Sequence, residues 1–313
     1  MTTELKGVAL LPTIDPSWMA QLTLTTVHAV LQPEREWQLP PRVSVTVRGA
    51  LGAAMFDVAC QQAHRRCADC AARSSCLLPT WYDPSLGGGH DPRPFALQVE
   101  PRGRSVVAPP TPLHVRVRFF GPLPEPELVV QALTRAAESG LGPQRVRHRL
   151  TQLTVTGSDA PAAVVRDGER VQAWPTPGLL TRQVQLPLEP RGARVRLISP
   201  LQLKVRGAAP TPGELVDAAI GRVRGLARQL GERVDRRWPA TEHLPGEWRE
   251  LRFAQASRKP SSGRGSHDLS GWLGELALGH EALPFVDLLA AAELLHIGRS
   301  SSSGLGRVAV TWL

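Results

Sequence analysis

Four cysteines lie close together in the chain and are its best candidate metal ligands. They are Cys60, Cys67, Cys70 and Cys76, in the pattern C-x6-C-x2-C-x5-C, and the chain has no other cysteine. The close pair has the spacing of a zinc knuckle, and four thiolates can surround a tetrahedral Zn²⁺ and leave no position for water. Such a zinc would be structural, with His64 able to replace one thiolate. Two disulfides or free buried thiols are the alternatives, but a cytosolic protein favours metal.

A glycine-rich stretch, LLHIGRSSSSGLGRVAV at residues 294–310, is the second feature suited to chemistry. Its glycines allow positive φ angles and a close approach of the backbone to a ligand, and a nest of backbone N–H groups can hold phosphate oxygens. Arg299 and Arg307 flank the loop with positive charge. The stretch is not a P-loop, because no Lys-Ser/Thr follows the last glycine and a strand is expected next. A flexible turn is the alternative interpretation.

The charge of the chain points to an anionic partner. The formal net charge is +9, and because only three of the 37 basic residues are lysine, 37 − 3 = 34 are arginine. The planar donor fork of arginine suits phosphates and base edges, so the excess fits nucleic acid, although a GC-rich genome would also explain it. Arg258 and Lys259 lie in a basic loop, SRKPSSGRGS, that is either solvated or in contact with phosphate. Aromatic residues make up only 5%, so stacking on bases would be secondary.

Hydrophobic patterning predicts an α+β fold that would position these residues. The chain has 313 residues, 42% hydrophobic and 21% charged, enough for one large domain or two ordinary ones. In each half the order reads β-α-β-β-α-β, the ferredoxin-like arrangement, with the cysteine segment inserted in the first half. We expect strands at 20–31, 94–99, 113–120, 193–205, 249–256, 272–278 and the last residues, helices at 48–63, 126–139, 212–232 and 283–296, and further strands between 145 and 185.

Membrane insertion and secretion are not expected. No apolar run approaches the ~20 residues of a membrane span, and the acidic residues Glu4 and Asp15 near the N-terminus argue against a signal peptide. We therefore expect a cytoplasmic protein.

The glycine-rich stretch and three further segments resemble, in order and spacing, the repeat-RNA endoribonucleases of the CRISPR-associated RAMP superfamily. The further segments are ISPLQLKVRG (198–207), RFAQASRKP to LSGWLGEL (252–276) and LPFVDLLAAAELLHIGR (283–299). In the first half, VRGALGAAM (47–55), the cysteines and RPFALQVEP (93–101) fit the same group. The resemblance is strongest over the last third of the chain.

This resemblance implies two tandem ferredoxin-like domains. Residues 1–190 would carry the cysteine insert at 60–80, and residues 191–313 would carry the glycine-rich loop at 298–306. The implied activity is sequence-specific, metal-independent cleavage of CRISPR precursor RNA within its repeats. It would leave 2′,3′-cyclic phosphate and 5′-hydroxyl ends and retain the repeat hairpin. Other CRISPR effector subunits are possible partners.

The resemblance also implies where the site residues lie. The family's catalytic histidine, where one exists, lies near the end of the first helix, and His64 fits that place, with a role at the metal as the alternative. His28, for which inward packing is the alternative, and His267, which could face a groove between the domains, are the other candidates. RNA contacts are expected from Arg258, Lys259, Gly298, Arg299, Ser300, Gly304, Gly306 and Arg307.

Two other functions fit the same features. A non-catalytic RNA-binding subunit of a CRISPR effector complex would share the glycine loop, so the loop does not separate it from a nuclease. A zinc-knuckle DNA-binding protein is the third interpretation.

Overall fold

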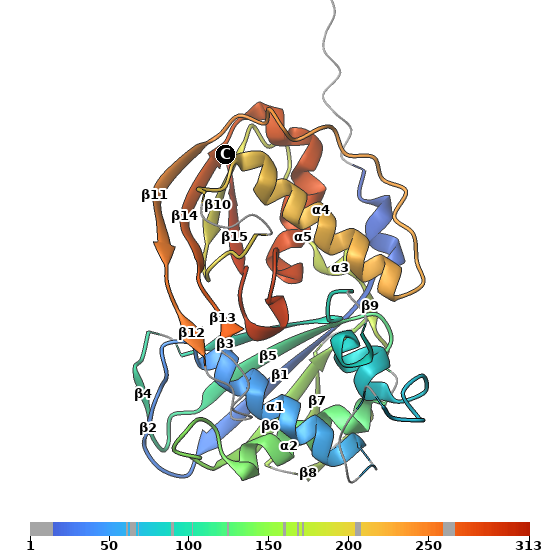
Figure 1. The fold of residues 1–313 in the computed structure, drawn as a ribbon, viewed down its shortest axis with the longest axis vertical. Coiled ribbons are helices and arrows are strands. Elements are labelled where there is room, and N and C mark those ends of the chain that lie inside the picture. Colours follow the sequence, from blue (N-terminus) through green and yellow to red (C-terminus); the bar gives the residue numbers. More distant parts are fainter. Residues whose placement is uncertain are drawn as a thin grey trace, which may run out of the picture.

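The structure is a computed structural model with two α+β domains, each an antiparallel sheet with helices packed on one face (Figure 1). Both domains are ferredoxin-like, so the α+β fold expected from the sequence is confirmed. The residues that the structure describes are 15–60, 62, 67, 69–88, 91–101, 103–123, 125–158, 161–167, 169–170, 172–203, 208–258 and 267–313.

The first domain is built on four antiparallel strands in the order β3-β5-β1-β6, the strand order of a ferredoxin-like sheet. Alternation along β5 explains its two faces: Leu113, Val115 and Val117 are buried against the helices, whereas the residues between them face the other side. The elements are β1 (Thr23–Pro33), α1 (Val43–Ala59), β3 (Phe95–Glu100), β5 (Leu113–Phe120), α2 (Pro126–Ser139) and β6 (His148–Thr156).

The two helices of this domain show where local signals hold and where packing overrides them. α2 has the predicted bounds, with Pro126 in its first turn and Gly140 at φ 87° just after its end. α1 begins at Val43, five residues earlier than predicted. Val43, Val45 and Val47 are buried there, and this burial outweighs the low helix propensity of valine. α1 ends before Cys60, whose backbone is extended.

Shorter elements surround this sheet. The cysteine segment follows α1 and leads into a single π-helical turn, η2 (Leu78–Tyr82), and a 3-10 turn, η3 (Pro84–Gly87). Further strands extend or flank the sheet. They are β7 (Ala162–Arg166) and β8 (Glu169–Arg170) beyond β6, β9 (Gly178–Leu179) beside β1, and the ribbon of β2 (Trp37–Gln38) with β4 (Val106–Val107). The remaining short helices are η1 (Ser17–Gln21) and α3 (Leu180–Gln183).

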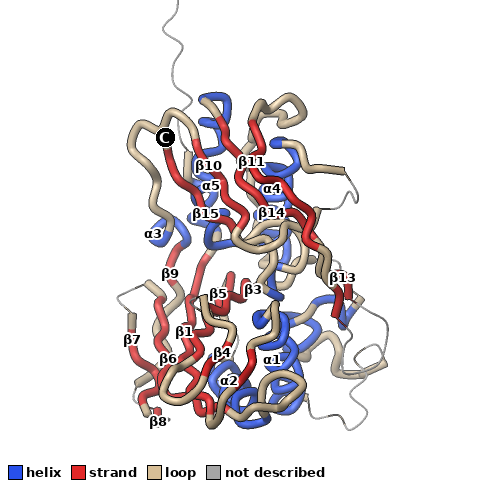
Figure 2. The backbone as a smooth tube through the Cα atoms, turned by 90° about the vertical axis from the view of Figure 1, so that its left-hand side faces the viewer, coloured by secondary structure: helices blue, strands red, loops and turns tan. Residues whose placement is uncertain are grey.

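The second domain repeats the topology, with the strand order β11-β14-β10-β15. Its first helix, α4, is fixed by a capping box in which Thr211 and Glu214 bond each other's backbone amides. Its elements are β10 (Ala193–Leu197), α4 (Pro212–Gln229), β11 (Glu247–Ala254), β14 (Gly271–Leu278), η4 (His280–Phe285), α5 (Val286–Leu295), η5 (Ser301–Ser303) and β15 (Val308–Trp312). A hairpin of β12 (Ser257–Arg258) and β13 (His267–Asp268) extends from β11 and β14 toward α1, as both views show (Figures 1 and 2).

The two domains share buried surface. Leu24, Ala96 and Phe120 belong to the sheet of the first domain, yet they lie in the hydrophobic cluster that forms the core of the second. Arg222 of α4 is buried at the same junction. Its guanidinium donates to the carbonyl of Leu295 at the end of α5 and to the carbonyls of Arg93 and Phe95 at the start of β3. Apolar burial and this buried cation therefore fix the second domain against the first.

Among the described helices, none combines the length and the apolar character that crossing a membrane requires.

Candidate RNA interface

The glycine-rich loop joins α5 to β15, and its glycines adopt positive φ angles in a closely packed conformation. Gly304 and Gly306 have φ angles of 82° and 67°, in the left-handed region that side chains disfavour. A Cβ atom on Gly306 would lie 1.7 Å from the carbonyl oxygen of Ile297, and one on Gly304 would lie 2.5 Å from Cβ of Ser44. Gly306 thus closes the loop on itself, and Gly304 lets the loop approach the first turn of α1.

The loop consequently lies at the junction of three segments. Leu305 packs with Val45 of α1 and with Leu269, which follows the β12–β13 hairpin. The side chain of Arg42, just before α1, donates to the carbonyl of Leu269. The loop, the start of α1 and the base of the hairpin therefore form one packed cluster, although they are far apart in the sequence (Figure 1).

Most backbone amides of the loop are already used inside the protein. The amides of Arg299 and Gly306 donate to the carbonyls of Gln202 and Pro200, and that of Arg307 donates to Oγ of Ser199. Those of Ser303, Gly304 and Leu305 bond within the loop. Because these donors are engaged, they are not available to a phosphate. Contact with an anion at these positions has to come from side chains instead.

The side chains of the loop differ in their exposure. Ser301 and Ser302 are buried, Ser300 is half-buried, and Arg299 is exposed. Arg307 is half-buried, and its Nη2 lies 4.0 Å from Oε1 of Glu100 on β3. Arg299 is therefore open to solvent and Arg307 lies toward the first domain, while the central serines are packed inside the protein.

The sheet of the first domain adds charge beside Arg307. Arg116 and Arg118 lie on β5, on the face turned away from α1 and α2. Arg116 forms an ion pair with Glu100 at 3.3 Å, and Arg118 donates to Oε1 of Gln98 at 3.4 Å. Burial, together with the neighbouring charges of Arg116 and Arg307, lowers the pKa of Arg118 to about 10. Arginines from both domains thus converge at the junction.

The glycine loop begins at a buried histidine that these arginines surround. His296 is inaccessible to solvent and has a φ angle of 51°. Burial, and then the charges of Arg118, Arg222 and Arg307, lower the pKa of His296 well below its ordinary value. His296 is therefore neutral at physiological pH, and the positive charge of this region belongs to the arginines alone.

His28 lies on the same open face of the first sheet. Its Nε2 is 3.0 Å from Nδ1 of His114 on β5, and the two rings stack with centroids 5.2 Å apart. In the strand register, His28 lies opposite Arg116 and Thr154. Inward packing, the alternative considered for His28, is thus not what the structure shows, because the side chain is half-buried on the polar face. Two imidazoles within hydrogen-bond distance can pass a proton between them, which suits acid–base chemistry.

The other candidate residues are less completely described. His267 and Arg258 pair with each other in the β12–β13 hairpin, which places their backbones near the glycine loop and the start of α1. His64 and Lys259 lie outside the described residues. The structure therefore brings Arg258, His267, Gly304 and Arg307 toward one junction, and sets His28 on the sheet face that borders it.

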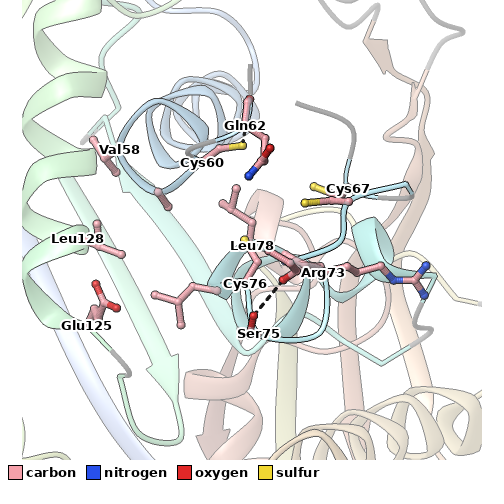
Figure 3. A pocket seen from close by; sticks show the side chains of 15 residues that line it. Val58, Cys60, Gln62, Cys67, Arg73, Ser75, Cys76, Leu78, Glu125 and Leu128 are labelled. Carbon is pink, nitrogen blue, oxygen red and sulfur yellow. Dashed lines mark hydrogen bonds between the residues drawn. The ribbon is translucent and has the colours of Figure 1, made fainter. Parts of the chain in front are cut away.

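The four cysteines line one pocket at the far end of α1 (Figure 3). The thiol groups are free, and they are close enough that the charges of Cys76, Cys60 and Cys70 add to burial in raising the pKa of Cys67. Among the described residues, no three potential ligands lie as close together as a bound metal requires. The four expected thiol ligands therefore line one pocket, but the described ones do not lie close enough together to form a closed coordination shell.

A buried ion network holds the end of this insert on the first domain. The carboxylate of Asp83 accepts from Arg93 at 2.7 Å and from Arg48 of α1 at 3.4 Å. Burial alone would raise the pKa of Asp83, but the hydrogen bond and charge of Arg93, with Ser85 and Arg48, lower it. Tyr82 stacks on Phe95 next to this network. The segment after the cysteines is thus anchored to both α1 and β3.

Comparison with known proteins assigns the second domain. Residues 195–308, from β10 through the glycine loop, match the family model described as CRISPR-associated endoribonuclease Cas6. Over this domain the chain is similar to the Cas6 family. Residues 22–176 match a second model, AF_1859_N, described as an N-terminal domain. No curated protein sequence matches the chain.

Solved Cas6 structures share the fold. The product complex of Cas6 (TTHB231) from Thermus thermophilus is 16% identical, with a TM-score of 0.53 over 93% of this chain and 99% of that chain. A partial Cas6-RT-Cas1–Cas2 complex is 13% identical, also with a TM-score of 0.53, over 93% of this chain and 46% of that chain. At these identities the likeness shows the tandem ferredoxin-like arrangement and nothing finer.

Sequence reasoning missed the charged face of β5. The sequence predicted a strand at 113–120, LHVRVRFF, but no role was assigned to His114, Arg116 or Arg118. The period of two places these three side chains on one face, so the signal was present. What the sequence did not contain was the proximity of that face to Arg307 of the Cas6 domain.

The packing of Gly306 yields a prediction about stability. Gly306→Ala should lower the free energy of unfolding by about 3 kcal/mol, because it adds a clash with the Ile297 carbonyl to the strain of a positive φ angle. Gly231→Ala is the matched control: its φ angle is 75°, but a Cβ atom there meets nothing within 4 Å. The control should lose only about 1 kcal/mol from backbone strain. Urea unfolding of both variants measures the difference, and equal losses would show that the fit around Gly306 is loose.

Proposed function

We propose that the chain is an endoribonuclease that cleaves CRISPR precursor RNA within its repeats and binds the repeat hairpin. The observation that carries the proposal is the Cas6 domain at 195–308, which includes the glycine loop. The loop packs on the first domain beside arginines from both domains, where it would contact the phosphate backbone of the RNA. Arg299 and Arg258 would add attraction at the edge of the interface.

The reaction we infer is a metal-independent transesterification. A base removes the proton of a ribose 2′-hydroxyl, the 2′-oxygen forms a bond to the adjacent phosphorus, and the bond from phosphorus to the 5′-oxygen breaks. An acid then protonates the leaving 5′-oxygen. The products are a 2′,3′-cyclic phosphate and a 5′-hydroxyl. Cations beside the phosphate stabilise the negative charge that builds up on its oxygens in the transition state.

Three histidines are the proposed acid–base residues: His64, His28 and His267. His28 has the best described surroundings, because His114 can hand a proton to it or accept one from it at 3.0 Å. His267 lies on the hairpin beside the glycine loop. Imidazole suits both roles because its ordinary pKa is near neutrality.

The activity is tested by incubating the purified protein with a panel of repeat hairpins in EDTA. We expect cutting at one site per repeat, with a cyclic phosphate on the upstream product identified by mass spectrometry. Tight binding without cutting would instead favour a non-catalytic RNA-binding subunit of an effector complex. Preference for duplex DNA would favour a DNA-binding protein.

Histidine variants test the proposed acid–base residues. Replacing the residue that acts as acid or base by alanine should slow single-turnover cleavage by ~10²-fold or more, with repeat-RNA affinity nearly unchanged. The variants are His64→Ala, His28→Ala and His267→Ala, and His243→Ala is the control because His243 is exposed in a loop of the second domain. If all three cleave as fast as the control, the chemistry does not depend on these histidines.

We also propose a structural zinc ion bound by Cys60, Cys67, Cys70 and Cys76. Support comes from their spacing and from the single pocket that they line. The four thiolates would supply the tetrahedral set of sulfur ligands that a structural zinc ion takes. Structural zinc sites contribute their binding energy to folding, so a bound metal would stabilise the fold of the insert.

Elemental analysis tests this site. Protein purified without chelator should contain one zinc per chain, and Cys67→Ser or Cys70→Ser should lose it and unfold at a lower temperature. Arg73→Ala is the control, since Arg73 lines the same pocket but cannot bind zinc as a thiolate does. The zinc proposal fails if the wild-type protein carries no stoichiometric metal.

A further inference from the structure

Three arginines meet where the two domains join, on an otherwise polar face of the first sheet. Arg116 and Arg118 stand two residues apart on β5, and therefore on the same side of the sheet. In the strand register, Arg118 lies opposite Thr26 of β1 and Ala96 of β3. Arg307 comes from the other domain, at the end of the glycine loop.

The negative charge beside these arginines does not balance them. A single oxygen, Oε1 of Glu100, serves Arg116 at 3.3 Å and Arg307 at 4.0 Å, and it also accepts from the amide of Gln98. Glu293, whose charge also acts on Arg118 and Arg307, is exposed and accepts from the amide of Val310 at 2.8 Å. Among the described residues, three cations thus share two carboxylates, and one of those carboxylates also accepts a backbone hydrogen bond.

The lowered pKa values of the arginines show the electrostatic cost of this arrangement. Burial and like charges lower the pKa of Arg118 to about 10, and burial lowers the pKa of Arg307. An anion placed among them would offset both effects. The cluster is reachable from solvent, because the side chains of Arg116 and Arg307 remain 33% and 34% exposed.

We propose that Arg116, Arg118 and Arg307 form a single binding site for one backbone phosphate of the RNA, with Glu100 holding the arginines in place until the phosphate arrives. The proposal rests on the proposed function, since it takes RNA as the ligand. Guanidinium groups bind phosphate oxygens through two parallel donors, which favours a fixed phosphate position. Because both domains contribute, the RNA strand at this phosphate crosses the junction between the two sheets. A phosphate contact positions the strand and does not read its sequence.

Glu100 gives the site a signature that a purely structural ion network would not have. In Glu100→Gln the side chain keeps its shape but no longer competes with phosphate for the arginines. Repeat-RNA affinity should therefore rise, by about threefold or more at low salt. A structural network would lose an ion pair in this variant and bind RNA equally or more weakly.

Arginine variants supply the opposite change. Arg116→Ala/Arg118→Ala should weaken binding to repeat RNA and to unrelated RNA alike, and should flatten the dependence of log affinity on log salt by about one unit. Arg116→Lys/Arg118→Lys should keep the slope but bind less tightly, because lysine keeps the charge and loses the fork. Arg135→Ala is the control: it removes one positive charge from α2, on the opposite side of the sheet.

Binding is measured by fluorescence anisotropy across a salt series, with thermal unfolding to check that each variant is folded. The site is overturned if the double alanine variant binds like Arg135→Ala, or if Glu100→Gln binds no more tightly than the wild type. Wild-type protein that binds repeat RNA without cutting it would refute the nuclease and leave this site intact. Wild-type cleavage together with unchanged binding by the double variant would refute this site alone.

Discussion

The candidate RNA interface depends on how tightly the glycine loop of the Cas6 domain is pressed against the first domain. Gly304 meets Ser44 of α1 at a distance that leaves no room for a side chain. Arg222 reinforces this contact from within, by bonding the end of α5 and the start of β3 at once. Its burial lowers its pKa to about 9, which is a cost of keeping a guanidinium away from water. Three hydrogen bonds to backbone carbonyls compensate for that cost, so the junction tolerates a buried cation that pairs with no carboxylate in the described part of the chain.

The packing of the glycine loop against the first domain, together with the hydrogen bonds of Arg222, determines which side chains at the junction reach solvent. If the loop moved away from β3, Arg307 would leave Glu100, and the charges of the two domains would no longer add. The loop itself has little freedom to adapt to a ligand, because its amides are bonded to Pro200, Gln202 and its own carbonyls. The positions of the charged side chains at this junction are therefore set by the fixed relation of the two sheets more than by a flexible loop.

The sequence predicted the elements whose signals are local and missed those decided by packing. α2 and β5 have the predicted bounds, since proline, glycine and strict alternation mark them. α1 begins earlier because buried valines, poor helix formers, are held by the core. The strand predicted at 193–205 ends at Leu197, before Pro200, and the helix predicted from 283 begins as a 3-10 turn around Pro284. The pairing of His28 with His114 needs the register of β1 and β5, which alternation alone does not give.

The same distinction separates the two roles of the glycine loop. Glycine-rich loops suggest phosphate held by backbone amides, but that interpretation assumes that the amides point outward. Here the amides of Arg299, Gly306 and Arg307 point into the protein, and the glycines serve close packing. The arginines at either side remain as the groups able to meet an anion, and Arg307 alone is joined by cations of the first sheet. The glycines of this loop therefore indicate where the two domains pack closely together. The arginines of β5 indicate where positive charge is available to an anion.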